Sequence, residues 1–198
     1  MRIDAGKDER AHDKLEEAIL LSVPVYKVLL IGNANTGKSS LIRRLILDEF
    51  DESYCATVGV DLSAIAVNVD AFTPVILTVI DLGGQEDFTA LRTQYYKGAH
   101  FVTLVYDVSD RESFEDLPEW YQGLLVALDG ETGKQLPGAL VGNKSDREED
   151  GQVNSADGRV YADSLGWPFF ESSAKTGENV RDVFTRIAKE LYGRHPPR

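Results

Sequence analysis

The octapeptide Gly-Asn-Ala-Asn-Thr-Gly-Lys-Ser at residues 32–39 constrains the fold of this chain more than any other feature. Two glycines with four residues between them, followed by Lys and Ser, form the pattern of a phosphate-binding loop, or P-loop. The apolar run Val25–Ile31 precedes the octapeptide, and an amphipathic stretch, Ser39–Leu47, follows it. We therefore predict a buried strand, a tight loop and a helix in that order. A chance Gly-rich turn is the alternative, and the flanking strand and helix argue against it.

The residue types in this loop suit a polyphosphate. Gly32 and Gly37 permit a tight turn in which successive backbone N–H groups point at phosphate oxygens. The N-terminus of the following helix adds partial positive charge. Lys38 is predicted to contact the β- and γ-phosphates, and the Ser39 hydroxyl is an oxygen ligand of the kind that Mg²⁺ prefers. The loop predicts a nucleoside triphosphate without selecting its base.

Apolar runs and amphipathic stretches alternate along the rest of the chain. Such alternation is typical of an α/β fold whose mostly parallel sheet is covered by helices on both faces, with the ligand beyond the carboxyl ends of the strands. We expect residues 24–193 to form the domain, residues 1–23 a partly helical or disordered extension, and residues 194–198 a short tail. Strands are predicted at 25–31, 60–69, 75–80, 101–106, 139–141 and 168–170; helices are predicted at 39–47, 113–128, 155–165 and 180–191, with 86–97 irregular or helical.

Composition excludes several function classes for this chain of 198 residues. Its formal net charge of -12 argues against nonspecific binding of nucleic acid and against simple attraction to anionic lipid. Cys55 is the only cysteine, so an intramolecular disulfide and a cysteine metal site are excluded, and a reducing, cytoplasmic compartment is favoured. We find no apolar segment long enough to cross a bilayer. The sequence ends Gly-Arg-His-Pro-Pro-Arg without a cysteine for prenylation, so we expect any membrane association to be peripheral, either indirect or through a C-terminal anchor that this sequence does not include.

The tetrapeptide Asn-Lys-Ser-Asp at 143–146 is predicted to read the base. The carboxylate of Asp146 can accept hydrogen bonds from guanine N1–H and from its exocyclic amine, and adenine lacks this pair of donors. A buried carboxylate left unpaired by the wrong base is costly, so this contact would discriminate sharply. Lys144 can lay its aliphatic stem across the ring, and Asn143 can tie the loop to the P-loop. The alternative is a surface turn.

The hexapeptide Ser-Ser-Ala-Lys-Thr-Gly at 172–177 offers a second contact with the base. The Ala174 N–H can donate to guanine O6, and Lys175 can cover the ring. By itself the segment also fits a polar loop that caps a helix.

The pentapeptide Asp-Leu-Gly-Gly-Gln at 81–85 suits a sensor of the γ-phosphate. Asp81 is predicted to hold Mg²⁺ through water, Gly84 to donate its N–H to the γ-phosphate, and Gln85 to orient the attacking water. Thr57 is predicted to complete the Mg²⁺ shell beside Ser39. Such short patterns also arise by chance, and only their order along the chain gives them weight.

Two aromatic residues lie between the first helix and the second strand. Phe50 is predicted to pack edge-on against guanine and Tyr54 to close over the phosphates, with packing in the core or a loop as the alternative. The residues expected to bind nucleotide are Asn35, Thr36, Gly37, Lys38, Ser39, Ser40, Phe50, Tyr54, Thr57, Gly84, Asn143, Lys144, Asp146, Ser173, Ala174 and Lys175.

This order of motifs resembles the Ras superfamily of small GTPases, most closely its Rab branch, over residues 26–192. The most specific matching segments are 57–62, 84–88, 95–100, 105–109 and 169–180. The resemblance implies a P-loop NTPase G domain with a six-stranded sheet. It also implies switch loops near 50–62 and 82–96 that exchange factors, GTPase-activating proteins and effectors read.

Several residues depart from the Rab pattern. Ala34 stands where Ras has glycine, and Leu82-Gly83 stand where Rab proteins usually carry Thr-Ala, a change that resembles Arf-like proteins. Val79-Ile80 replace the usual apolar residue and Trp, and the C-terminal cysteine and basic tail of the Rab branch are missing.

The resemblance implies a GTP- and GDP-binding switch that requires Mg²⁺ and hydrolyses GTP slowly, with Lys38 and Gln85 as the catalytic residues. We expect a monomer that acts in membrane trafficking or a related signalling process. The alternatives are a GTP-binding scaffold with little or no hydrolysis, which Ala34 favours, a protein whose nucleotide is only structural, and a P-loop kinase, which the base-reading motif disfavours.

Overall fold

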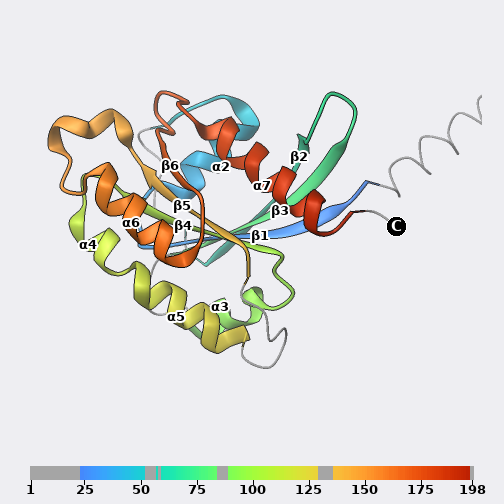
Figure 1. Cartoon of the computed structure of the whole chain (residues 1–198), viewed down its shortest axis with the longest axis horizontal. Helices are drawn as coiled ribbons and strands as arrows, with labels where there is room; N and C mark the ends of the chain where they lie inside the picture. Colours follow the sequence, from blue (N-terminus) through green and yellow to red (C-terminus); the bar gives the residue numbers. More distant parts are fainter. Residues whose placement is uncertain (1–22, 52–56, 58, 84–88, 129–135, 197–198) are drawn as a thin grey trace, which may run out of the picture.

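The structure is a computed structural model that describes residues 23–51, 57, 59–83, 89–128 and 136–196 (Figure 1). The described strands form one six-stranded sheet in the order β2-β3-β1-β4-β5-β6. β2 and β3 pair antiparallel, and the other neighbours pair parallel. The predicted α/β architecture is confirmed. The strands are β1 (Val25–Ile31), β2 (Val60–Asn68), β3 (Pro74–Leu82), β4 (Phe101–Asp107), β5 (Gly138–Asn143) and β6 (Phe169–Ser172).

Helices cover both faces of the sheet, and β1 shows why (Figure 1). Its side chains alternate between the two faces: Val28 and Leu30 belong to one buried cluster, and Leu29 and Ile31 belong to the other. α2 and α7 complete the first cluster, and α5 and α6 contribute to the second. The sequence of a strand that is covered on both faces is a nearly continuous apolar run. The helical elements are α2 (Lys38–Leu47), α3 (Thr89–Tyr96), α4 (Arg111–Glu115), α5 (Leu117–Leu128), the 3-10 helix η2 (Ser145–Asp150), α6 (Ser155–Leu165) and α7 (Val180–Arg194).

The prediction of a single helix over 113–128 is wrong, because the chain forms α4 and α5 with a break at Asp116. The Asp116 N–H still donates to the carbonyl of Glu112, at 3.0 Å, and closes α4. Pro118 then lies in the first turn of α5. In a continuous helix its ring would clash with the carbonyl of residue 114, whereas a first turn tolerates proline.

β3, β4 and β5 run further than predicted, and the extensions of β3 and β5 include the candidate site residues Asp81 and Asn143. β3 ends at Leu82, β4 at Asp107 and β5 at Asn143. Backbone pairing continues through these polar ends, for example between Asp107 and Asn143. β6 begins at Phe169, one residue later than predicted, because Pro168 has no N–H for the ladder, and it ends at Ser172, two residues later than predicted. Asp81 and Asn143 therefore lie on the sheet itself.

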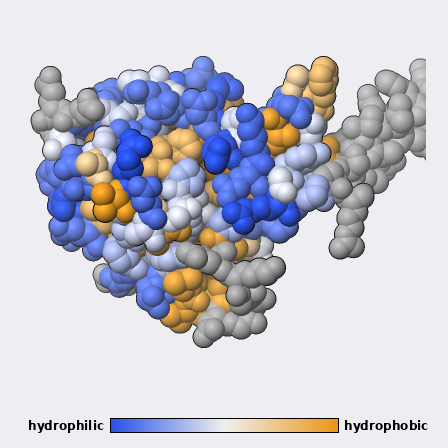
Figure 2. Space-filling model, in the orientation of Figure 1, coloured by the Kyte–Doolittle hydropathy of each residue, from blue (hydrophilic) through white to orange (hydrophobic). Residues whose placement is uncertain are grey.

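The face of the molecule in Figure 2 is largely polar, and apolar side chains lie at the end of the β2–β3 hairpin. Phe72 lies in this turn and is 93% exposed. The side chain of Asp70 closes the turn by accepting from the Phe72 N–H, at 2.8 Å, and from the Thr73 hydroxyl, at 3.0 Å. Among the described helices, none has the length and apolar character needed to span a membrane.

Three rings meet near the start of β1, at the end of the strand away from the P-loop. Tyr26, His100 and His195 lie with ring centroids 5.8–6.4 Å apart. The Tyr26 hydroxyl donates to the His195 carbonyl at 2.6 Å and joins the end of α7 to the sheet. The Lys27 N–H donates to His100 Nδ1 at 2.9 Å, so this nitrogen must carry no proton. Burial lowers the pKa of His100, and the charges of His195 and Lys27 lower it further.

We expect acidification to destabilise the fold through His100. Because its folded-state pKa lies below its ordinary value of about 6.5, the unfolded chain takes up the proton first, and stability falls as the pH drops through this range. In the His100→Asn variant the amide oxygen can still accept from Lys27 but does not titrate. Thermal unfolding measured at about pH 8 and about pH 5.5 should therefore show a larger drop in midpoint for the wild type than for His100→Asn. Equal drops would contradict this role.

Candidate functional site

A cavity of about 420 Å³ lies at the carboxyl ends of the strands. Its wall is built from the P-loop, the start of α2, the end of β3 and the loops after β5 and β6. The candidate site residues that line it are Asn35, Gly37, Lys38, Ser39, Ser40, Phe50, Thr57, Asp81, Asn143, Lys144, Asp146, Ala174 and Lys175. Thr36 and Ser173 are fully buried and support the wall. Tyr54, Gly84 and Gln85 lie outside the described residues.

Glycine is required twice in the P-loop by close contacts. Gly32 has a φ of +140°, and a Cβ there would lie 2.1 Å from the carbonyl oxygen of Val105 in β4. Gly37 has a φ of +91°, and its Cβ would lie 2.2 Å from Asn143 Nδ2. Neither the backbone conformation nor the space admits a side chain. The loop is thus pressed against β4 and the base-reading loop.

Lys38 is buried and bridges the loop. Its ammonium donates to the carbonyl oxygens of Gly32, at 2.8 Å, and Asn33, at 2.7 Å. α2 begins at Lys38, and its N-cap, Gly37, supplies no side-chain hydrogen bond. A helix start of this kind directs N–H groups and partial positive charge outward, here into the cavity. The site therefore combines a fixed ammonium with backbone donors, as a phosphate chain requires.

Three oxygen-bearing side chains meet at the end of β3. Ser39 Oγ lies 2.6 Å from Thr57 Oγ1 and donates to Asp81 Oδ2, to which Thr57 also donates at 3.3 Å. Asp81 is fully buried, and its Oδ1 has no hydrogen-bond partner among the described residues. Burial raises the pKa of the Asp81 carboxyl, which the bond from Ser39 and the charge of Lys38 partly oppose. Two hydroxyls and an under-coordinated carboxylate form an oxygen set that fits Mg²⁺.

Asn143 joins three segments of the wall. Its Nδ2 donates to the carbonyl of Thr36 at 2.8 Å, which ties β5 to the P-loop. Its Oδ1 accepts from the Ala174 N–H at 3.2 Å and from the Ser172 hydroxyl at 3.4 Å. The Ala174 N–H that the sequence assigned to guanine O6 is thus already bonded to Asn143, and a base would have to share it.

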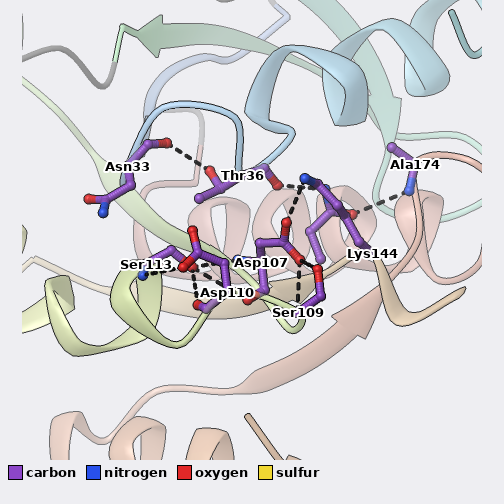
Figure 3. Close-up of polar contacts among 9 residues, drawn as sticks. Asn33, Thr36, Asp107, Ser109, Asp110, Ser113, Lys144 and Ala174 are labelled. Carbon is purple, nitrogen blue, oxygen red and sulfur yellow. Dashed lines mark hydrogen bonds and ion pairs between the residues drawn. The ribbon is translucent and has the colours of Figure 1, made fainter. Parts of the chain in front are cut away.

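Lys144 is held by Asp107, a residue that sequence reasoning did not assign to the site (Figure 3). The Lys144 ammonium lies 2.6 Å from Asp107 Oδ2, and Asp107 is buried at the end of β4. The other oxygen, Oδ1, accepts from Ser109 N–H at 2.9 Å and Ser109 Oγ at 2.7 Å. With its ammonium fixed, Lys144 keeps its aliphatic stem along the cavity wall. The sequence feature that could have identified Asp107 is its position at the end of β4, the strand that pairs with the strand before the P-loop.

Asp146 is positioned by Ser173, whose hydroxyl donates to Asp146 Oδ1 at 2.6 Å. Ser173 also accepts from the Thr176 N–H at 3.1 Å, so its hydroxyl is oriented by its own loop. The expectation of a buried carboxylate is corrected, because Asp146 is exposed at the cavity mouth. Its burial would come only from a base placed over it.

Arg44 in α2 supports the loop after β6 and was also missed. Its Nε donates to the carbonyl of Ala174 at 2.8 Å, and its second terminal nitrogen donates to the carbonyl of Lys175 at 2.7 Å. The planar guanidinium suits two adjacent carbonyls because its donors diverge in one plane. Nothing local in the sequence indicates this pairing, which joins the helix of the phosphate loop to the loop beside the base.

Comparison with known families gives one further finding. The sequence model of the Ras family matches residues 27–193 of the chain. The match runs from β1 into α7 and includes every residue that lines the cavity.

Proposed function

Because the chain belongs to the Ras family, whose members are small GTPases that bind guanine nucleotides with Mg²⁺, we propose that it is a switch that binds GTP and GDP in the cavity described above. One observation carries this proposal. The P-loop and the exposed carboxylate of Asp146 line the same cavity, although they lie far apart in the sequence. The P-loop suits a phosphate chain, and the Asp146 carboxylate suits the edge of guanine that carries hydrogen-bond donors.

In this proposal, Asp146 accepts from guanine N1–H and the exocyclic amine. Lys144, anchored on Asp107, and Lys175 cover the ring with their aliphatic stems. Phe50, which lines the cavity, packs against the ring edge. The preference for guanine then follows mainly from Asp146, because the Ala174 N–H is shared with Asn143.

The phosphates lie along the P-loop, with Lys38 at the β- and γ-phosphates and the backbone N–H groups of residues 35–40 around them. Ser39 and Thr57 would hold Mg²⁺ directly, and Asp81 would hold it through water. When bound there, Mg²⁺ supplies positive charge to the phosphate oxygens.

Water attacks the γ-phosphorus and the bond to the β-phosphate oxygen breaks, which yields GDP and phosphate. Lys38 and the loop N–H groups stabilise charge on the phosphoryl oxygens, and we assign Gln85 to place the water. Among the described residues that line the cavity, the arginine is Arg147, which follows Asp146 on the base side. With no arginine on the phosphate side of this lining, we expect turnover on the order of 10⁻⁴ to 10⁻³ per second, as in Ras, until a partner supplies one.

We further propose that the output is the conformation of the loops near 50–62 and 82–96, which exchange factors, activators and effectors would read. The Rab-like segments at 57–62 and 95–100 favour a role in membrane trafficking or a related process. We expect a cytoplasmic monomer that contacts membranes either indirectly or through a C-terminal anchor.

The nucleotide that copurifies with the protein tests the proposal. Denaturing the full chain and separating the released compounds by chromatography should give GDP or GTP at about one per chain. If none is released, titration with fluorescent GDP and ATP in the presence of Mg²⁺ follows. Binding of ATP alone, or of neither nucleotide, would overturn the proposal.

The alternative function is a GTP-binding scaffold, which Ala34 in the cavity wall favours. If the protein is an enzyme, single-turnover phosphate release from bound GTP will be lost in Gln85→Leu, because leucine cannot orient water. Gln94→Leu is the matched control, since Gln94 is an exposed residue of α3. Equal and negligible release from the wild type and both variants, with GTP bound, would support the scaffold.

A further inference from the structure

Asn33, the second residue of the P-loop, has both ends of its side chain bonded to one segment far along the chain. Its Nδ2 donates to Asp116 Oδ2 at 2.7 Å, and its Oδ1 accepts from Trp120 Nε1 at 2.6 Å. The Asp116 carboxylate can only accept and the Trp120 indole N–H can only donate. The amide nitrogen of Asn33 must therefore face Asp116, and its amide oxygen must face Trp120. Asn33 was not among the residues predicted to bind nucleotide.

The two partners are arranged to act together. Asp116 lies at the junction of α4 and α5, and the Trp120 N–H donates to the Asp116 carbonyl at 3.2 Å, which begins the first turn of α5. Residues four apart lie on the same side of a helix. The start of α5 thus presents a carboxylate and an indole N–H to the P-loop from one face.

The main-chain carbonyl of Asn33 connects the residues near the start of α5 with the phosphate site. This carbonyl accepts from the Lys38 ammonium at 2.7 Å. It also accepts from the Thr36 hydroxyl at 3.0 Å (Figure 3). The side chain of Asn33 is therefore held by α5 while its carbonyl holds the ammonium that faces the cavity. A rotation of Asn33 would move this acceptor away from Lys38.

α5 also packs against α3, the helix that follows the predicted γ-phosphate sensor. Tyr96 of α3 and Leu117 and Leu124 of α5 belong to one buried cluster. Figure 1 shows the two helices side by side below the sheet. The same helix thus contacts both the P-loop and the segment that follows the predicted γ-phosphate sensor.

We propose that Asp116 and Trp120 are positioning residues that hold Asn33, and through its carbonyl Lys38, in the phosphate-binding arrangement, so that α5 controls the rate at which nucleotide leaves. This inference rests on the proposed function and deepens it by naming the residues that govern release. It predicts that breaking the contact speeds release of GDP without touching a residue in contact with the nucleotide.

The test is a charge exchange across the contact. In Asn33→Asp, a carboxylate would face Asp116, and release of a fluorescent GDP analogue, chased with excess GDP, should be faster by about tenfold. Asp116→Asn should release at nearly the wild-type rate, because its amide oxygen still accepts from Asn33. In the double variant Asn33→Asp/Asp116→Asn, the new carboxylate accepts from Trp120 and from the new amide, so the rate should return to within about threefold of wild type. Trp120→Phe removes one neutral bond and should speed release by about three- to tenfold.

Two controls separate positioning from a general effect of charge or folding. Asn35→Asp adds a charge to an exposed residue of the same loop. Asp116→Asn should not reverse its effect, because the bond that Asp116 accepts comes from Asn33 and not from residue 35. The indole N–H resonance of Trp120 should shift in Asn33→Ala, whereas the double variant should retain the wild-type position. Trp167, the other tryptophan of the chain, provides an internal reference.

The outcomes separate this inference from the function on which it rests. A wild type that binds no guanine nucleotide overturns both. A wild type that binds GDP, with Asn33→Asp and Trp120→Phe releasing it at the wild-type rate, overturns the positioning role alone. Fast release by Asn33→Asp that Asp116→Asn fails to reverse also overturns it, because charge near the phosphates would then explain the effect.

Discussion

Asp146→Asn is expected to convert a protein that prefers guanine nucleotides into one that prefers xanthine nucleotides. Xanthine carries an oxygen where guanine carries its exocyclic amine, so an amide that donates replaces a carboxylate that accepts. Two hydrogen bonds to a charged group are lost with GDP, at about 1.5–3 kcal/mol each, so the affinity for GDP should fall by roughly three orders of magnitude.

The structure makes this substitution a clean test of the base. Ser173 Oγ donates to Asp146 Oδ1 at 2.6 Å, and the amide oxygen of asparagine can accept the same bond. The loop position should therefore survive the change. Because Asp146 is exposed in the described structure, the substitution leaves no buried group unpaired in the protein itself.

Competition between GDP and XDP for the wild type and the variant measures the switch in preference. Asp163→Asn is the matched control, because it removes one exposed carboxylate from α6, away from the cavity lining. It should leave the preference for GDP unchanged. An unchanged preference in Asp146→Asn would show that another group reads the base.

Gly32→Ala is expected to destabilise the protein by about 3–5 kcal/mol and to abolish nucleotide binding. The conformation at a φ of +140° is nearly confined to glycine and costs other residues about 1–3 kcal/mol. The new methyl group would also lie 2.1 Å from the carbonyl oxygen of Val105, a central residue of the sheet. Neither backbone can yield without breaking the pairing of β1 with β4.

Gly166→Ala separates the clash from the strain. Gly166 caps α6 with a φ of +70°, and nothing lies within 4 Å of the position that a Cβ would take there. The free energy of unfolding of this variant should fall by only about 1–2 kcal/mol, and its affinity for nucleotide should be unchanged. Chemical denaturation followed by circular dichroism, with and without GDP, measures both. Equal losses of stability in the two variants would contradict the role of the contact with Val105.

Much of the fold was predictable because its signals are local. The bounds of β1 and α6 match the prediction, since an apolar run and an amphipathic period report directly on what each residue faces. The break before α5 was also readable, because Pro118 lies inside a helical pattern, where a proline ends or kinks the helix. The extra residues of β3, β4 and β5 were not, because polar residues join a strand through backbone pairing that only the neighbouring strand provides.

The sequence by itself determined the order of strands and helices, the phosphate loop and the residue types that suit guanine, because each depends on neighbours within a few positions. Only the tertiary structure decided how those residues are held. Trp120 and Asn33 lie 87 positions apart, and Arg44 and Ala174 lie 130 positions apart. The pairing of Lys144 with Asp107 likewise depends on β4 and β5 lying side by side. A hydrogen bond requires two groups within about 3 Å, and for residues so far apart in the chain it is the packing of the sheet and helices that brings them to this distance.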